Sequence, residues 1–290
     1  MIERISSKSE MRSAVAEARR EGKTVGFVPT MGALHAGHVS LVHAACERCD
    51  IVVTSVFVNP TQFGQGEDFE LYPRRLEGDI EMLAAEGVEL VFTPSVEEMY
   101  GTGALVTVDP GSLAARWEGE VRPGHFVGVA TVVTKFLSIV RPDLAFFGEK
   151  DYQQLAVVKR LSLDLDLGVG VVGCPIVRDA DGLALSSRNA FLSAEERDHA
   201  LALSEALEAA AQSLAWGERR GEVLAIAMRE AAASRAPGAL TLDYAAVVDL
   251  ETLEPVAIVD RPARAIIAGR VGSTRLIDNC SLVPPTGGVA

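Results

Sequence analysis

The stretch that decides the fold is Pro29–His38 (PTMGALHAGH), which directly follows the apolar, β-type run Thr24–Val28. Beyond it, apolar residues recur at helical spacing from Val39 to Ala45, so we predict a strand, a glycine-bearing turn and a helix in succession. In parallel α/β folds, nucleotides bind at such strand-to-helix turns. The N–H groups and the positive dipole end of the predicted helix would favour phosphate.

Two histidines of this stretch form the pattern His35-x-Gly37-His38. The spacing puts both imidazoles on one helical face, within reach of the same phosphate oxygens. Gly37 removes a side chain that would obstruct a ligand over the turn. Imidazole donates a hydrogen bond when neutral and can carry positive charge when phosphate charge builds up. The alternative is that both histidines simply cap or pack the helix, and the motif alone does not decide between the two.

The order of elements along the chain predicts two domains. In the first part, strand-like apolar runs alternate with helical stretches, which predicts a parallel sheet wrapped by helices. The predicted strands are Ile51–Val58, Glu89–Phe92, Leu144–Phe147 and Gly170–Cys174. The predicted helices are His38–Cys49, Leu76–Glu86, Val127–Ile139 and Tyr152–Leu163.

The pattern changes after residue 177. Ser193 and Glu196 form a capping-box pair that predicts the start of one long alanine-rich helix, ending near Ala215. A second helix and three strands follow, at Glu222–Ser234, Leu242–Leu250, Ala263–Ala268 and Leu276–Asp278. We therefore predict an α/β chain with a Rossmann-like parallel-sheet domain over residues 1–177 and a smaller α+β domain over residues 178–290.

Composition agrees with an enzyme of this kind and disfavours other classes. A chain of 290 residues, 48% of them hydrophobic, can bury the cores of two domains. A net charge of −13 argues against nonspecific nucleic-acid binding, which needs an electropositive surface. No apolar run approaches the roughly 20 residues of a membrane span, and the polar start has no targeting pattern. We therefore expect a cytoplasmic protein that binds neither membrane nor nucleic acid.

Cysteine and histidine spacing offers two alternatives. Cys46-x-x-Cys49 could serve redox chemistry or half a zinc site, but no second CxxC follows and the pair falls inside a predicted helix, so we predict packing thiols. His35, His38 and His43 could bind zinc, yet the HExxH pattern is absent and no carboxylate has the matching spacing. Zinc catalysis is therefore disfavoured.

Polar side chains follow two more predicted strands, at the sheet edge where ligands of open α/β folds bind. Asn59 and Gln62 offer neutral amides that can donate to a carboxylate and accept from hydroxyls, although Asn-Pro is also a turn dipeptide. After the second strand, Gly148 allows close backbone approach, Lys150 can balance phosphate charge, and Asp151 can hold a ribose hydroxyl or a cation. The alternative for this GEKD segment is a surface turn.

The segment Leu185–Arg188 (LSSR) lies near Asp179, Asp181 and Gly182, a composition typical of a mobile turn. Its two hydroxyls and the Arg188 guanidinium could clamp a phosphate, because a guanidinium donates to two oxygens at once. The alternative is that a serine caps a short helix that begins here.

Four segments together resemble one family, the pantothenate synthetases, which belong with the nucleotidyltransferases that carry an HIGH-type motif. They are PTMGALHAGH (29–38), SVFVNPTQF (55–63), FFGEKDYQQL (146–155) and VRDADGLALSSRN (177–189), and they follow the family's order. The similarity extends over nearly the whole chain. It implies a ligase that uses ATP and Mg²⁺ to condense pantoate with β-alanine, through a pantoyl adenylate, into pantothenate, AMP and pyrophosphate. It also implies a homodimer through the N-terminal domains.

The resemblance also assigns roles to individual residues. It implies catalysis by His35, His38, Lys150 and Arg188. It implies contacts to pantoate and β-alanine from Asn59, Gln62, Arg122 and Gln154, with Gln62 and Gln154 on opposite sides of pantoate. The residues that it places at ATP are Met31, Gly32, Ala33, Leu34, His35, Ala36, Gly37, His38, Gly148, Glu149, Lys150, Asp151, Val177, Leu185, Ser186, Ser187 and Arg188.

Two positions depart from the family pattern. The family usually has two adjacent acidic residues where this chain has Gly78-Asp79, which leaves Asp79, or Asp151 through water, beside the ATP phosphates as magnesium ligands. Leu185 stands where the family's KMSKS-like loop, which closes over ATP, commonly has methionine. Arg122 and His125 match a family segment near the nucleotide.

Three other functions stay open. Another HxGH adenylyltransferase, acting on a different small acid or phosphate, would share the histidine pair but would not be expected to carry both Gln62 and Gln154. A zinc hydrolase would hold metal. A non-enzymatic ATP-binding regulator would bind nucleotide but release no pyrophosphate when pantoate is added.

Overall fold

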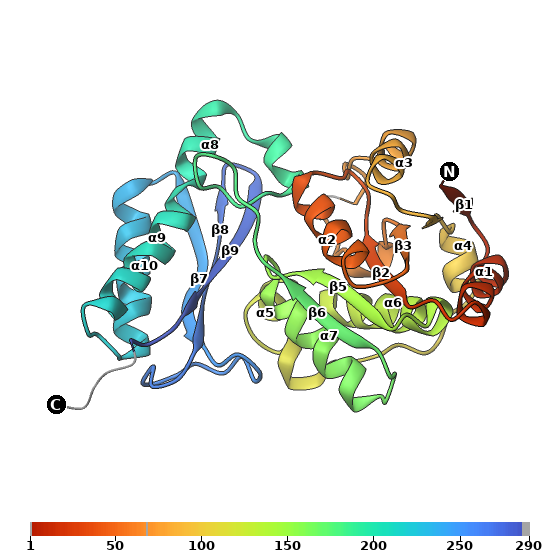
Figure 1. Ribbon diagram of the computed structural model, residues 1–290. Coiled ribbons are helices and arrows are strands. Elements are labelled where there is room, and N and C mark those ends of the chain that lie inside the picture. Colours follow the sequence, from red (N-terminus) through yellow and green to blue (C-terminus); the bar gives the residue numbers. More distant parts are fainter. Residues whose placement is uncertain (1, 68, 286–290) are drawn as a thin grey trace. The chain divides into compact units, whose positions relative to one another are not determined.

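Nine strands form two separate sheets in the computed structural model, which describes residues 2–67 and 69–285 (Figure 1). The chain divides into two compact units. The first contains the residues up to Glu149 together with Gln153–Val177, and the second contains Lys150–Tyr152 together with the residues from Arg178 onward. The sequence places residues 150–152 in the N-terminal domain, so their membership of the second unit differs from that expectation.

The first unit is built on a six-stranded parallel sheet in the order β1-β4-β3-β2-β5-β6. Its strands are β1 (Glu3–Ile5), β2 (Val25–Thr30), β3 (Ile51–Val56), β4 (Leu90–Phe92), β5 (Leu144–Gly148) and β6 (Gly170–Cys174). Apolar residues dominate the central strands because both faces of the sheet are covered. The Rossmann-like α/β prediction is confirmed, although the short edge strand β1 was not predicted.

The order in which strands are added to the sheet reverses at β2, which makes β2 the topological switch point of the sheet. From β2 the chain adds β3 and then β4 on one side, and later adds β5 and β6 on the other. Phe27 of β2 therefore lies between Val53 of β3 and Ala145 of β5. The segments after β2 and β5 leave the sheet next to one another at its carboxyl edge, where open α/β sheets bind ligands.

Helices cover both faces of this sheet (Figure 1). They are α1 (Lys8–Arg20), α2 (Ala36–Cys46), α3 (Leu76–Ala85), α4 (Val96–Tyr100), α5 (Glu118–Val121), α6 (His125–Val140) and α7 (Tyr152–Asp164). The core beneath α2 and α3 includes Val28, Leu41, Leu83 and Phe146. On the opposite face the ring of Phe136 in α6 packs against Phe27 and Phe92, with ring centroids 5.6 and 6.2 Å away.

Helix α2 is shorter than the sequence predicts. It ends at Cys46, so Cys49 lies outside it and the prediction of two thiols within one helix is wrong. Asp50 lies between α2 and β3. Its carboxylate accepts hydrogen bonds from the backbone N–H and the hydroxyl of Thr24, at 2.8 and 2.7 Å, and so ties the chain to the start of β2 just before β3 begins.

The second unit packs helices against a three-stranded antiparallel sheet in the order β7-β8-β9. Its elements are α8 (Ala194–Ala200), α9 (Ala202–Ala215), α10 (Gly221–Arg235), β7 (Leu240–Val248), β8 (Ala263–Val271) and β9 (Thr274–Leu282). Its core includes Leu203, Leu207, Leu224, Met228 and Ile267. The smaller α+β architecture predicted for this part of the chain is confirmed.

The single long helix predicted from Ser193 is two helices in the structure. Its predicted start is confirmed, because Ser193 and Glu196 form the capping box at α8. The helix is interrupted at Leu201, which joins α8 to α9. The hydroxyl of Ser204 donates to the Leu201 carbonyl at 2.9 Å, a local side-chain bond of the kind that bends helices.

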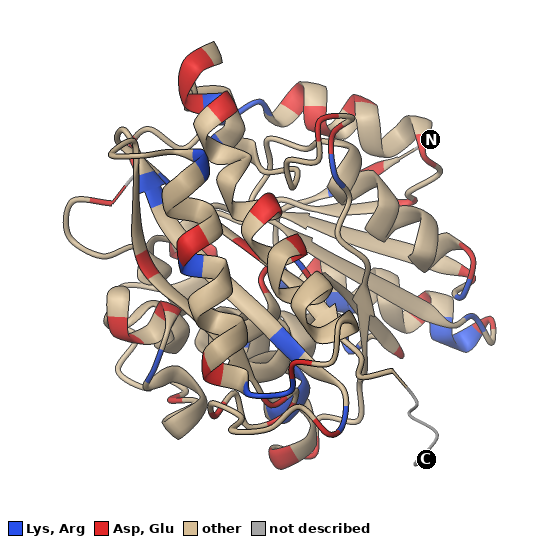
Figure 2. Cartoon of the chain, turned by 90° about the vertical axis from the view of Figure 1, so that its left-hand side faces the viewer, with Lys and Arg blue, Asp and Glu red and all other residues tan. Residues whose placement is uncertain are grey.

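The acidic charge of the chain is distributed over its surface. Figure 2 shows Asp and Glu on many helices and loops, interspersed with Lys and Arg. The net charge of −13 therefore does not come from a single acidic segment. Within residues 2–67 and 69–285, no helix is long and apolar enough to cross a membrane.

We expect Phe136→Ala to lower the free energy of unfolding of the first unit by about 3–5 kcal/mol, because it removes a buried ring and leaves a cavity. Phe136 is 3% exposed, whereas Leu163 in α7 is 66% exposed. Leu163→Ala is therefore the matched control and should cost less than about 0.5 kcal/mol. In a Trp216→Phe background, the fluorescence of Trp117 during urea unfolding reports on the first unit. Equal losses in the two variants would contradict the assignment of this core.

Candidate active site

A buried carboxylate fixes the shape of the turn after β2. Gly32 (φ 84°) and Ala33 (φ 51°) adopt left-handed backbone conformations, which lead the chain from β2 into α2. Asp79 in α3 accepts the N–H of Ala33 at 3.0 Å and that of Leu34 at 2.9 Å. A Cβ on Gly32 would lie 2.9 Å from Asp79 Oδ2, so the close approach also requires glycine. Asp79 is buried, and it holds the turn that presents the histidines.

His35 and His38 form a reciprocal cap at the start of α2. Nδ1 of His35 accepts the N–H of Gly37 at 3.1 Å, and Nδ1 of His38 accepts the N–H of His35 at 3.4 Å. A backbone N–H can only donate, so we assign the proton of each neutral ring to Nε2. The ring centroids are 4.2 Å apart, which places two Nε2–H donors close together at one helix N-terminus.

The environment of His38 keeps its ring neutral. Burial, and secondarily the neighbouring His35, lower the pKa of His38 to about 3. At pH 7 His38 is therefore a hydrogen-bond donor and not a cation. Capping and ligand binding are compatible here, because the cap uses Nδ1 of each ring while the proton sits on Nε2.

The loop after β3 orients Gln62 through Asn59. Pro60–Gln62 is a short 3-10 helix capped by Asn59, whose Oδ1 also accepts the hydroxyl of Tyr100 at 2.7 Å. Asn59 Nδ2 donates to Gln62 Oε1 at 3.0 Å, and Gln62 Nε2 lies 3.1 Å from Met31 Sδ. Asn59 is 1% exposed. The structure therefore gives Asn59 a role in positioning Gln62, and its contact with the substrate stays a prediction.

Arg122 is paired within the protein. Its Nε and Nη2 donate to the two carboxylate oxygens of Glu67 at 2.7 and 2.8 Å, and its Nη1 lies 3.1 Å from Nε2 of His125. Nδ1 of His125 donates to the Gln62 carbonyl at 2.8 Å. Burial raises the pKa of Glu67, but the hydrogen bonds and charge of Arg122 outweigh burial and lower it to about 2. Arg122 is thus linked to the Gln62 turn through His125, and its direct contact with the substrate stays a prediction.

The remaining predicted residues of the first unit lie near the same sheet edge. Gly148 ends β5, and the N–H of Glu149 donates to the carbonyl of Cys174 at the end of β6, at 2.8 Å. Val177 follows β6, and Gln154 lies in the first turn of α7, partly exposed. The fold therefore gathers these segments with the turn of β2 at the carboxyl ends of neighbouring strands.

Lys150, Asp151 and the LSSR segment belong to the second unit. Ser186 caps the 3-10 helix Ser187–Phe191, and its Oγ accepts the N–H of Arg188 at 3.3 Å. The capping alternative for this segment is therefore present in the structure. The phosphate clamp of Leu185–Arg188 stays a prediction.

The side chains that the structure describes include no cluster that would hold a metal ion by itself. Among those residues, no three His, Cys, Asp or Glu side chains lie together as a metal cluster. Both carboxylate oxygens of Asp79 accept backbone N–H groups of the turn, and its role as a metal ligand stays a prediction.

Several positioning residues had no signal in the sequence. Asp79 lies 46 residues from Ala33, Tyr100 lies 41 residues from Asn59, and Glu67 lies 55 residues from Arg122. No local spacing marks contacts across such separations. Only the packing of α3, α4 and the loop after β3 brings these groups to the site.

We expect His38 to make the first unit less stable in acid. Its pKa is about 3 in the folded protein, against 6.5 for an unperturbed histidine, so the unfolded chain takes up a proton first and stability falls as the pH drops from 6.5 toward 3. His38→Asn keeps an acceptor for the His35 N–H but does not titrate, so its unfolding free energy should fall less steeply between pH 6.5 and 4. Urea unfolding across this range measures both slopes. Identical slopes below pH 6 would rule out a depressed pKa.

Comparison with known proteins identifies the family of this chain. The family model described as pantoate-beta-alanine ligase matches residues 3–281. The chain is 55% identical to the pantothenate synthetase of Rubrobacter xylanophilus, over 95% of this chain and 97% of that protein. It is 51% identical to the pantothenate synthetase of Rhizorhabdus wittichii, over 95% of this chain and 96% of that protein.

Solved structures give the same assignment. The crystal structure of pantothenate synthetase from Thermus thermophilus matches with a TM-score of 0.92 and 49% identity, covering 98% of this chain and all of that one. The pantoate-beta-alanine ligase of Francisella tularensis, crystallised with beta-gamma ATP and beta-alanine, matches with a TM-score of 0.80 and 34% identity over 99% of each chain. The chain is therefore an enzyme that belongs to the pantoate–β-alanine ligase family.

Proposed function

We propose that the protein condenses pantoate with β-alanine to give pantothenate, using MgATP and passing through a pantoyl adenylate. The observation that carries the proposal is the pair of Nε2–H donors of His35 and His38 at the N-terminus of α2, beside the oriented amide of Gln62. A helix N-terminus with two added donors suits a nucleotide phosphate. A primary amide suits the carboxylate and hydroxyls of a hydroxy acid.

In the first step, a carboxylate oxygen of pantoate attacks the α-phosphorus of ATP and pyrophosphate leaves. Negative charge builds on the phosphate oxygens, so preorganised donors stabilise the transition state more than the ground state. His35 and His38 supply such donors as neutral rings. Mg²⁺ enters with ATP and offsets phosphate charge.

In the second step, the amine of β-alanine attacks the acyl carbon of the mixed anhydride. The bond from that carbon to the phosphate oxygen breaks, AMP leaves, and the amine loses its proton as the amide forms. No covalent enzyme nucleophile is required. The protein's contribution is to position the two reactants and to keep water from the anhydride.

Further residue roles complete the proposal. Gln62 and Gln154 hold pantoate, and Asn59, Arg122 and His125 position Gln62. The turn Met31–His38, Gly148–Asp151, Val177 and Leu185–Arg188 bind ATP, with Lys150 and Arg188 as the cationic phosphate contacts. We also propose that the protein acts in the cytoplasm as a homodimer, which the family resemblance supports.

We expect pyrophosphate release from MgATP to depend on pantoate, and pantothenate to appear by mass spectrometry only when β-alanine is also present. His38→Ala should lower the rate of pyrophosphate release about 10²- to 10³-fold, as removal of a preorganised donor does at developing phosphate charge. The histidine of α8, His199, offers a matched control outside the site, and His199→Ala should retain full activity.

Folded protein with no pantoate-dependent release would overturn the proposed substrate and favour another small acid or phosphate. Near-normal release by a folded His38→Ala variant would overturn the role of the histidine pair alone.

We expect Asp79→Asn to raise the KM for MgATP about 10-fold. The NH₂ group of the new asparagine cannot accept a hydrogen bond, so one of the two backbone N–H groups of the turn loses its acceptor. An unpaired donor of this kind costs about 1–3 kcal/mol. The magnesium concentration for half-maximal rate should not change. Glu77→Gln is the matched control, since Glu77 lies in the same turn of α3 and its side chain is 81% exposed. A large shift of the magnesium concentration for half-maximal rate in Asp79→Asn alone would indicate that Asp79 is a metal ligand.

A further inference from the structure

The chain crosses between the two units twice within a few residues. Glu149 belongs to the first unit, Lys150–Tyr152 to the second, and Gln153 to the first again. Glu149 is bonded to the end of β6, and the Gln153 amide donates to the carbonyl of Leu113 at 2.7 Å. Lys150–Tyr152, at the turn between β5 and α7, therefore forms a short insertion of the chain into the second unit.

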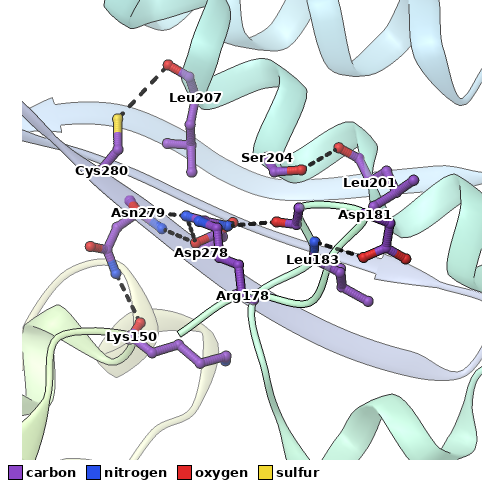
Figure 3. Close-up of polar contacts among 12 residues, drawn as sticks. Lys150, Arg178, Asp181, Leu183, Leu201, Ser204, Leu207, Asp278, Asn279 and Cys280 are labelled. Carbon is purple, nitrogen blue, oxygen red and sulfur yellow. Dashed lines mark hydrogen bonds and ion pairs between the residues drawn. The ribbon is translucent and has the colours of Figure 1, made fainter. Parts of the chain in front are cut away.

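Three contacts hold this insertion in the second unit. Asn279 Nδ2 donates to the carbonyl of Lys150 at 2.9 Å (Figure 3). The guanidinium of Arg264 lies over the ring of Tyr152 at 4.4 Å, and the Tyr152 hydroxyl donates to the Leu250 carbonyl at 3.2 Å. Asn279 is itself fixed, because its Oδ1 accepts Nε of Arg264 at 2.6 Å. It is 2% exposed, so its amide cannot rotate freely into water.

The neighbouring residue of β9 holds the segment that leads to Arg188. Asp278 is 4% exposed, and its carboxylate accepts hydrogen bonds from two guanidinium nitrogens of Arg178 at 2.7 and 2.9 Å (Figure 3). Arg178 also donates to the Gly182 carbonyl at 3.0 Å and pairs through its backbone with Ala184. The hairpin 178–184 is therefore bonded to β9 immediately before the LSSR segment begins. A bidentate, buried pair of this kind allows little movement of the hairpin.

From this arrangement we infer that Asp278 and Asn279 are positioning residues that hold Lys150 and the Arg188 segment in one fixed relation. Asn279 fixes the peptide plane from which Lys150 projects, and Asp278 fixes the hairpin that precedes Arg188. The two cationic groups proposed to contact phosphate are then held together within the second unit. The inference rests on the proposed function, in which Lys150 and Arg188 contact the phosphates of ATP.

A double-mutant cycle tests the link between Asn279 and Lys150. Asn279→Ala should lower kcat for pyrophosphate release about 10- to 100-fold, since small misplacements of a catalytic group cost rates of this order. The KM for pantoate should stay within about twofold of the wild-type value, because the link acts on Lys150 and not on the pantoate amides. In a Lys150→Ala background, the same substitution should change kcat less than about twofold, because its effect acts through the Lys150 side chain.

Two variants control for general damage. Asn279→Asp keeps an acceptor for Arg264 but replaces the amide donor to the Lys150 carbonyl with an oxygen that cannot donate. It should therefore reproduce the loss of kcat even if the alanine variant folds poorly. Cys280→Ala alters the next residue of β9, whose Sγ contacts the Leu207 carbonyl, and should leave kcat unchanged.

The outcomes separate the inference from the proposed function. A folded Lys150→Ala enzyme with normal kcat would remove the catalytic role of Lys150, and the inference with it. Two results would overturn the inference alone, provided that Lys150→Ala itself lowers kcat. In the first, Asn279→Ala lowers kcat in the Lys150→Ala background as much as it does in the wild-type enzyme. In the second, Asn279→Ala does not change kcat in the wild-type enzyme. Loss of kcat in Cys280→Ala to the same degree would also overturn it, because the effect would then be one of strand packing.

Discussion

The pairing of β2 with β3 on one side and β5 on the other is the constraint on which the rest of the first unit depends. It makes β2 the switch point, so the turn after β2 and the turn after β5 emerge next to each other. The placement of the histidine turn beside Gly148 follows from that pairing. A β2 strand paired on one side only would leave the histidine turn and the GEKD turn on separate parts of the sheet edge.

The backbone N–H groups of the histidine turn explain much of the local chemistry. Asp79 accepts two of them, and Nδ1 atoms of His35 and His38 accept two more. Because the histidines accept from the backbone, their tautomers are set before any ligand arrives. Burial keeps His38 uncharged. In the function that we propose, these rings are neutral, preoriented donors where phosphate charge develops, which requires little reorganisation during the reaction.

Different units of the chain hold the neutral donors and the cationic groups of the proposed function. The histidines and Gln62 are fixed by the parallel sheet and its helices, whereas the Lys150 carbonyl and the hairpin before Arg188 are bonded to residues of the antiparallel sheet. Arg122, the other cation predicted at the site, is already neutralised by Glu67 and serves the Gln62 turn. The cationic phosphate contacts that we propose, Lys150 and Arg188, both belong to the second unit.

The sequence by itself determined the alternation of strands and helices, the two architectures, the histidine motif and the family resemblance, because each is written in local spacing. It did not determine where α2 ends, that Leu201 interrupts a helix, or that residues 150–152 join the second unit. Nor did it show that Asn59 and Arg122 orient Gln62, or that Asp79 holds a turn. Those features depend on hydrogen bonds between residues tens of positions apart, and only tertiary packing decides which buried donor meets which acceptor.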